Sequence, residues 1–225
     1  YYRQHWYWWG EAHYRTTGGK LELTSIPESE WQTVEDEALW INRWQETGLG
    51  VIRTQIPQYF LEPVNDDGDP GTVSWEGFLF DTAIPIPPDY TRTANFASTF
   101  QAMKQAGVTI QLNPVYLSGW LTSNPIPDPY MGFPGEAFST YPPNDLDEYQ
   151  EYIYALLYYL VNVVEYPPDR IMLDVINEPD LGCGADPVVP CFWDNFDMSD
   201  IVAVVQRSAA AIEAVDDRIR MVGLA

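Results

Sequence analysis

An amide, a carboxylic acid and a proline stand together at Asn177, Glu178 and Pro179, and they are the residues best suited to chemistry. They directly follow the mostly apolar run 171–176, which has the composition of a buried strand. Packing of a strand needs none of these three groups. Barrel enzymes place catalytic acids at the carboxyl ends of buried parallel strands. Glu178 is therefore the first candidate for a general acid or base.

Four helical patterns, each followed by a short apolar run, are the elements that would position this acid. The first helix has apolar residues at helical spacing and ends at Gly48, and the fourth is expected to begin at Ser199. Alternating helices and strands predict a parallel sheet with right-handed crossovers. The helices are expected at 28–46, 95–105, 146–165 and 199–215, and the strands at 50–56, 108–113, 171–176 and 219–224.

The aromatic-rich segment 1–27 is harder to assign. Residues 13–23 are expected to form an edge ribbon, and a first strand of the sheet is expected in either 5–14 or 20–26. The pattern leaves these two alternatives open.

Long connections occur on one side of the predicted sheet only. The segments 57–91 and 114–145 follow two of the strands, whereas the junctions after the helices are short. Barrel enzymes build their sites from the loops that follow the strands. A doubly wound sheet would instead carry a glycine-rich phosphate turn after an early strand, and the sequence has none. We therefore expect one domain over 1–225, an α/β fold in which 28–225 supplies about the first five units of a TIM (β/α)8 barrel.

Composition excludes several classes of partner. The chain has 225 residues, a net charge of -22 and only two lysines, Lys20 and Lys104. Such a charge repels nucleic acid and anionic membranes. No apolar run approaches the roughly 20 residues of a membrane span. The acidic surface is typical of a soluble protein in an extracellular or salty medium, so we expect secretion.

Two cysteines, Cys183 and Cys191, bound a short loop rich in glycine and proline that follows Pro179. A disulfide between them would fit an oxidising compartment. Two free thiols are the alternative. A zinc pair would need further cysteine or histidine ligands nearby, which the sequence does not offer.

Three segments together resemble the large (β/α)8-barrel clan of retaining glycoside hydrolases, which includes cellulases, mannanases, and the glucosylceramidase and xylanase-like families. The triplet 177–179 matches the clan motif at the end of the fourth strand. Segment 48–53 is similar to the clan's second strand, which ends in an active-site arginine. Segment 112–120 resembles the third strand of the glucosylceramidase-like family, where a tryptophan often follows. The similarity extends over roughly residues 28–225.

The resemblance implies a role for each matched residue. Glu178 would be the general acid/base, Asn177 would hydrogen-bond the sugar 2-hydroxyl, and Arg53 would orient the nucleophile and keep it ionised. For Arg53 the alternative is a structural ion pair inside the barrel.

A retaining mechanism also needs a second carboxylate about 5 Å from the first. In this clan the nucleophile follows the seventh strand, and the sequence is expected to end at the fifth. We therefore expect the nucleophile beyond residue 225, in the remaining barrel half, carried by the same chain or by a cleaved second chain. Glu76 and Glu136 are weaker candidates, because they lie in long loops without a strand to fix them.

Aromatic residues after the strands are the expected platforms for sugar rings. Trp120, Tyr116 and Trp193 are the principal candidates, and Trp8, Trp9 and Trp75 are weaker ones. Ordinary packing is the alternative for each of them.

No metal or cofactor is assigned from the sequence. The histidines His5 and His13 have no cysteine or histidine at ligand spacing. The acidic segment 65–70 has oxygen ligands suited to calcium, but a solvated turn is the better interpretation, because asparagine, aspartate, glycine and proline are common turn formers.

The resemblance, together with the acidic composition, thus implies a secreted hydrolase that cleaves β-linked glycosides by double displacement. A non-catalytic carbohydrate-binding or assembly protein on a degenerate barrel is the alternative, since fold alone does not separate the two.

Overall fold

The computed structural model describes a large part of the chain, including most of the predicted β/α units. The described residues are 2–5, 13–17, 20–23, 32–33, 42, 44–62, 64–65, 68–69, 71–81, 84–86, 92–94, 96–115, 117–122, 142–176 and 197–222.

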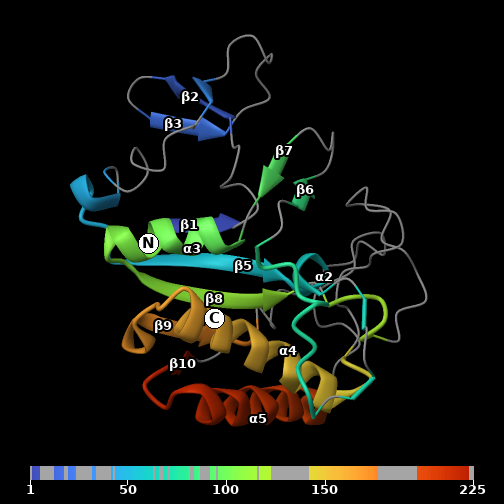
Figure 1. Cartoon of the computed structure of the whole chain (residues 1–225). Coiled ribbons are helices and arrows are strands. Elements are labelled where there is room, and N and C mark those ends of the chain that lie inside the picture. Colours follow the sequence, from blue (N-terminus) through green and yellow to red (C-terminus); the bar gives the residue numbers. More distant parts are fainter. Residues whose placement is uncertain are drawn as a thin grey trace.

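A five-stranded sheet forms the centre of the molecule, and every pairing in it is parallel. Its strands neighbour one another in the order in which they occur along the chain (Figure 1). An order without reversal is that of a singly wound barrel, whereas a doubly wound sheet reverses direction. This confirms the expected α/β fold of consecutive barrel units. The strands are β1 (Tyr2–His5), β5 (Val51–Pro57), β8 (Thr109–Val115), β9 (Ile171–Asp174) and β10 (Arg220–Val222).

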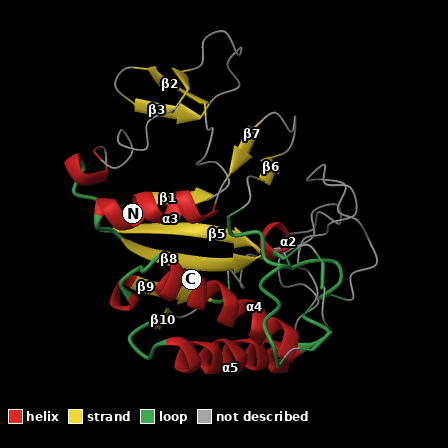
Figure 2. Cartoon of the chain, viewed as in Figure 1, coloured by secondary structure: helices red, strands yellow, loops and turns green. Residues whose placement is uncertain are grey.

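Helices lie along the sheet between successive strands (Figure 2). They are α3 (Phe96–Ala106), α4 (Leu146–Tyr158) and α5 (Met198–Val215), each close to its predicted range. The third predicted helix does not stay α-helical to residue 165, because α4 passes into a π-helical turn at Tyr159–Val163. Within the first predicted helix, 28–46, residues 42 and 44–46 are helical. Residues Gln32–Thr33 of the same range form a strand instead, so the helix does not extend over them as predicted. No described helix has the length and apolar character that crossing a membrane requires.

The amino-terminal segment corrects one prediction. The first strand of the sheet is β1, which precedes both predicted alternatives and shares only His5 with the range 5–14. It pairs with β5 in a register that sets Arg3 beside Arg53. The polar sequence of β1 conceals it from a search for apolar runs. The expected ribbon is confirmed: β2 (His13–Thr17) pairs antiparallel with β3 (Lys20–Leu23), and β4 (Gln32–Thr33) pairs with β2.

The long segment after β5 contains short elements of its own. It includes helix α2 (Gln58–Leu61), and strand β6 (Ile84–Ile86) that pairs antiparallel with β7 (Arg92–Ala94). A 3-10 turn (Pro168–Arg170) leads into β9.

Glycine ends two of the helices, as the sequence predicted for the first. Gly48 has φ 63°, its amide donates to the Gln45 carbonyl, and the Leu49 amide donates to the Trp44 carbonyl. Gly107 has φ 74° and ends α3 in the same way. This paired pattern satisfies carbonyls that the helix leaves without partners, and it needs a left-handed residue, which glycine adopts without strain.

The start of α5 corrects a second prediction. Its N-cap is Asp197, two residues before the predicted Ser199. The Asp197 carboxylate accepts from the amides of Ser199 and Asp200, and Asp200 accepts from the Asp197 amide in return. This reciprocal capping box satisfies more amide groups than a serine cap at 199 would.

The two faces of the sheet differ in chemistry. One face packs against helices and is mostly apolar, with Ile52, Ile110, Leu112 and Leu173 all fully buried. The register places polar residues on the opposite face, because side chains alternate along each strand. In a barrel, this second face lines the interior.

Buried tyrosine hydroxyls should make the fold sensitive to alkali. Burial raises the pKa of Tyr149 to about 12 from an ordinary value of 10.0. Burial also raises the pKa values of Tyr152 and Tyr166. Above pH 10 the folded state therefore binds more protons than the unfolded state, and the free energy of unfolding falls as pH rises. We expect this contribution to be constant below pH 10 and to decline by about 1.4 kcal/mol per pH unit for each such residue between pH 10 and 12.

Urea unfolding followed by circular dichroism across this pH range would measure the decline. Tyr149→Phe removes one ionisable group and keeps the ring, so its curve should fall less steeply than that of the parent above pH 10. Parallel curves for the two proteins would contradict the assignment.

Candidate active site at the carboxyl end of the sheet

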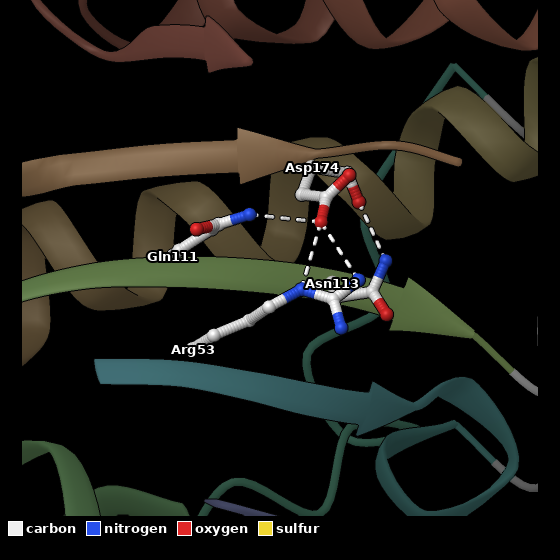
Figure 3. A network of polar contacts seen from close by, with 4 residues as sticks. All are labelled: Arg53, Gln111, Asn113 and Asp174. Atoms are coloured by element: carbon white, nitrogen blue, oxygen red, sulfur yellow. Dashed lines mark hydrogen bonds and ion pairs between the residues drawn. The ribbon is translucent and has the colours of Figure 1, made fainter. Parts of the chain in front are cut away.

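Four polar side chains meet on the inner face across three neighbouring strands (Figure 3). Asp174, the last residue of β9, is fully buried. Its Oδ2 atom accepts from Arg53 Nε at 3.0 Å and from Gln111 Nε2 at 2.9 Å, and Arg53 Nη2 lies 2.9 Å away. Asn113 donates from Nδ2 to the Asp174 backbone carbonyl at 2.8 Å. The network joins β5, β8 and β9 just below the predicted position of the acid.

Arg53 forms a nearly dry ion pair with Asp174. The exposed fractions of their side chains are 5% and 0%. Removing two charges from water is costly, and only close pairing with additional hydrogen bonds offsets that cost. Arg53 is the third residue of β5, which continues to Pro57, so it does not end its strand as the resemblance implied. The structure thus shows the ion pair that the sequence left as the alternative, while contact of Arg53 with a nucleophile stays a prediction.

Asp174, Gln111 and Asn113 are not identified as site residues from the sequence. Asp174 lies within the predicted strand 171–176, and Gln111 and Asn113 lie within the predicted strand 108–113. The available signal was the acid itself, because a carboxylate inside a buried strand is almost never left unpaired. Among the described residues the Oδ1 atom of Asn113 is buried without a hydrogen-bond partner.

A second buried cluster links the segments that follow β5 and β8. Gln58 donates to Glu62 Oε2 at 2.9 Å and accepts from the Ser118 amide at 2.5 Å. The Ser118 hydroxyl and Trp120 Nε1 both donate to the Glu62 carbonyl, at 2.9 and 3.1 Å. Gln58, Glu62 and Ser118 are buried. The indole of Trp120 is therefore fixed in orientation and half-buried at the carboxyl edge of the sheet.

The acidic segment 65–70 forms local turn hydrogen bonds in its described residues. Asn65 Oδ1 accepts from the Gly68 amide at 2.9 Å, and Asp69 Oδ1 accepts from the Gly71 amide at 3.1 Å. Asp69 Oδ2 accepts from the Thr72 hydroxyl. These are the local hydrogen bonds by which such side chains stabilise turns. Within the described parts of the chain, no three histidine, cysteine, aspartate or glutamate side chains gather as metal ligands would.

The structure brings together only part of the predicted site. Arg53 and Trp120 are described and lie on neighbouring strand units at the same sheet. Glu76 is exposed in a turn, unlike a nucleophile held by a strand. Several predicted residues lie outside the described residues: Asn177, Glu178, Pro179, Tyr116, Trp193, Glu136, Cys183, Cys191, Trp8 and Trp9.

Comparisons with known proteins find likeness among solved structures. A monomeric β-xylosidase from Caulobacter crescentus CB15 has 17% identity and a TM-score of 0.45, with 83% of this chain and 32% of that protein covered. A β-glycosidase from Thermosphaera aggregans has 14% identity and a TM-score of 0.48, with 84% and 42% covered. A mutant hyperthermophilic β-glucosidase has 16% identity and a TM-score of 0.44, with 80% and 45% covered.

The chain spans less than half the length of each of these three structures. No family model matches the sequence, and a search of curated proteins finds no match. The narrower resemblance to the glucosylceramidase, xylanase-like and cellulase families stays a prediction.

Proposed function

We propose that this chain carries the acid/base half of a retaining β-glycoside hydrolase, with Glu178 as the proton donor. The observation that supports this most strongly is topological. Asn177, Glu178 and Pro179 follow β9, which is the fourth strand of a parallel sheet whose strands are in chain order. A fourth-strand acid preceded by an amide is the pattern that the resemblance implies, and the carboxyl ends of barrel strands are where catalytic residues lie.

The proposed reaction proceeds in two balanced steps. Glu178 donates its proton to the glycosidic oxygen while a carboxylate nucleophile attacks the anomeric carbon, so the leaving sugar departs as an alcohol. Glu178, now ionised, removes a proton from water, which attacks the anomeric carbon and releases the nucleophile. Asn177 hydrogen-bonds the 2-hydroxyl, an interaction that strengthens as positive charge develops on the ring. The nucleophile is a glutamate outside residues 1–225, in the remaining barrel half.

The network around Asp174 supports this proposal because it gives the site a rigid structural support. Catalytic groups must be held within about 0.5 Å of a productive geometry by residues that are themselves fixed. Asp174 is fixed by Arg53, Gln111 and Asn113, and it precedes Glu178 by four residues on the same strand exit. Arg53 would in addition place positive charge near the nucleophile and keep it ionised.

Trp120 is the best supported of the proposed sugar platforms. Its indole nitrogen is already bonded to the Glu62 carbonyl, so its orientation is set before substrate binds. Aromatic rings offer an apolar face at low conformational cost. Tyr116 and Trp193 are proposed to extend this platform.

The proposed substrate is a neutral carbohydrate, and the proposed location is extracellular. The net charge of -22 supports both, since it would repel nucleic acid, anionic membranes and strongly anionic polysaccharides.

The stereochemical outcome of hydrolysis tests the proposal. The full-length protein would be incubated with a panel of plant, algal and microbial β-glycans, and the first product anomer would be followed by proton NMR. We expect β-configured product before mutarotation, because two displacements retain configuration. Initial release of the α anomer would overturn the retaining mechanism. Binding of glycans without any hydrolysis would favour a carbohydrate-binding protein instead.

A further inference from the structure

A pocket of about 570 Å³ lies between α4 and the segment 71–75, which follows β5. Its volume is within the range of small-ligand sites. Trp75, Tyr154 and Tyr158 line it together with Thr72, Gln150 and Glu151. The combination of three aromatic rings with hydroxyl, amide and carboxylate groups differs from the apolar packing seen between α4 and the sheet.

The pocket lies on the side of α4 opposite to the core. Gln150, Tyr154 and Tyr158 recur every four residues and therefore share one helix face, on which each is only partly buried. Tyr152 and Leu156, by contrast, are fully buried. None of the residues that line the pocket belongs to the network around Asp174 or to the cluster around Glu62.

The three aromatic rings form one continuous wall. The ring centroids of Trp75 and Tyr158 are 5.2 Å apart, and those of Tyr154 and Tyr158 are 5.7 Å apart. The interplanar angles are 45° and 32°. Trp75 keeps 44% of its surface exposed. A large apolar ring held at the surface beside polar groups is suited to stacking against the face of a sugar ring.

Aromatic residues that follow Trp75 in the chain pack against it and hold this wall in place. Phe78 contacts Trp75 and stacks on Phe80, and Phe80 stacks on Tyr159 with centroids 4.2 Å apart. The Tyr159 hydroxyl donates to Asp81. Phe78 and Phe80 are buried. The wall is therefore anchored to the end of α4 before any ligand arrives, which reduces the entropic cost of binding.

The polar groups of the pocket are also oriented. Gln150 accepts a hydrogen bond from Arg207 of α5 at 3.1 Å, which leaves its amide nitrogen able to donate. The Thr72 hydroxyl is turned towards Asp69. Hydrogen-bond donors and acceptors beside an aromatic wall suit a neutral saccharide, whose hydroxyl groups both donate and accept hydrogen bonds.

We propose that this pocket is an accessory binding site for a short neutral oligosaccharide, with Trp75 as its principal stacking residue. A quaternary ammonium ligand would need rings arranged around a common centre, whereas these rings contact one another along one wall. The proposal does not depend on Glu178 or on hydrolysis. A catalytically inactive protein would still bind sugar here, so failure of one proposal leaves the other standing.

Calorimetric titration with oligosaccharides tests the site. The probes would be β-1,4-linked gluco-, xylo- and manno-oligosaccharides and β-1,3-linked gluco-oligosaccharides, added to full-length protein that carries Glu178→Gln to prevent turnover. We expect at least one probe to bind, Trp75→Ala to weaken its affinity roughly tenfold, and Trp75→Phe to retain most of it. Val202→Ala on exposed α5 is the matched control and should leave the affinity unchanged.

A second measurement locates the binding without relying on the stability of a variant. The indole signal of Trp75 in a nitrogen-15 NMR spectrum, assigned from its loss in Trp75→Phe, should shift on addition of the bound probe. Three results would overturn the proposal: no probe shifts this signal, Trp75→Ala binds as tightly as the parent, or choline shifts the signal and the saccharides do not.

Discussion

Glu178→Gln should lower the rate of hydrolysis of unactivated β-glycosides by a factor of about 10² to 10⁴, because it removes the proton donor for the leaving oxygen. The substitution preserves size and hydrogen-bonding capacity, so the fold should be unaffected. For formation of the glycosyl-enzyme, the decrease in rate should be smallest with aryl glycosides whose leaving groups are acidic, because these groups depart without protonation. Steady-state and burst kinetics on a series of aryl glycosides would measure this dependence.

Two comparisons make this result specific to acid/base catalysis. Added azide attacks the glycosyl-enzyme without needing a base, so it should restore turnover of activated substrates in Glu178→Gln and yield a β-glycosyl azide. Glu213→Gln, an exposed change on α5, should behave as the parent. Unchanged activity of Glu178→Gln on unactivated substrates would remove Glu178 from the mechanism.

Asp174→Asn should destabilise the protein by about 3–5 kcal/mol, the typical cost of removing one partner from a buried ion pair. Arg53 would keep its charge, and its side chain is only 5% exposed. The effect should be visible as a lower urea midpoint in equilibrium unfolding. It should occur whether or not the protein is a hydrolase, because it concerns the sheet alone.

A surface ion pair provides the matched control for Asp174→Asn. Asp147 lies 2.7 Å from Arg207, but their side chains are 58% and 38% exposed. Solvent screens such pairs, so Asp147→Asn should cost less than about 1 kcal/mol. Replacing both charges, as in Arg53→Met with Asp174→Leu, should recover much of the stability lost in Asp174→Asn. Equal losses for Asp174→Asn and Asp147→Asn would contradict the structural role of the buried pair.

The β/α units were predictable because their helices and strands each bury an apolar face. The strands 50–56 and 108–113 were recognised from Ile52, Ile110 and Leu112, which the structure buries against helices. β1 is not predicted from the sequence, because its residues are mostly polar and carry no apolar strand pattern. In the sheet β1 pairs with β5, and its register sets Arg3 beside the polar Arg53. A strand is recognised from apolar residues on the faces that it buries. Where the inner face of the barrel is polar, only the outward-facing positions of the strand carry apolar residues.

The candidate site was predictable to a different extent. The triplet at 177–179 stands out by residue type and by its place in the sequence after a predicted strand, and β9 confirms that strand. The pairing of Arg53 with Asp174 depends on two strands separated by a third, which local patterns do not encode. The pocket beside Trp75 depends on how the segment after β5 folds over α4, and no spacing rule predicts that contact.

The bond between Arg53 and Asp174 joins residues 121 positions apart in the chain. It connects the second and fourth strands across the third, so it forms only when all three have assembled. In a partly folded chain with β5 and β8 but without β9, Arg53 would lack its partner Asp174. Its charge would then be buried without a counter-charge, or the inner face of the sheet would stay exposed to water. Such intermediates are disfavoured, and assembly of the three strands becomes a single cooperative event. Contacts of this sequence separation slow folding, so bringing β5 and β9 together should limit the rate of that event.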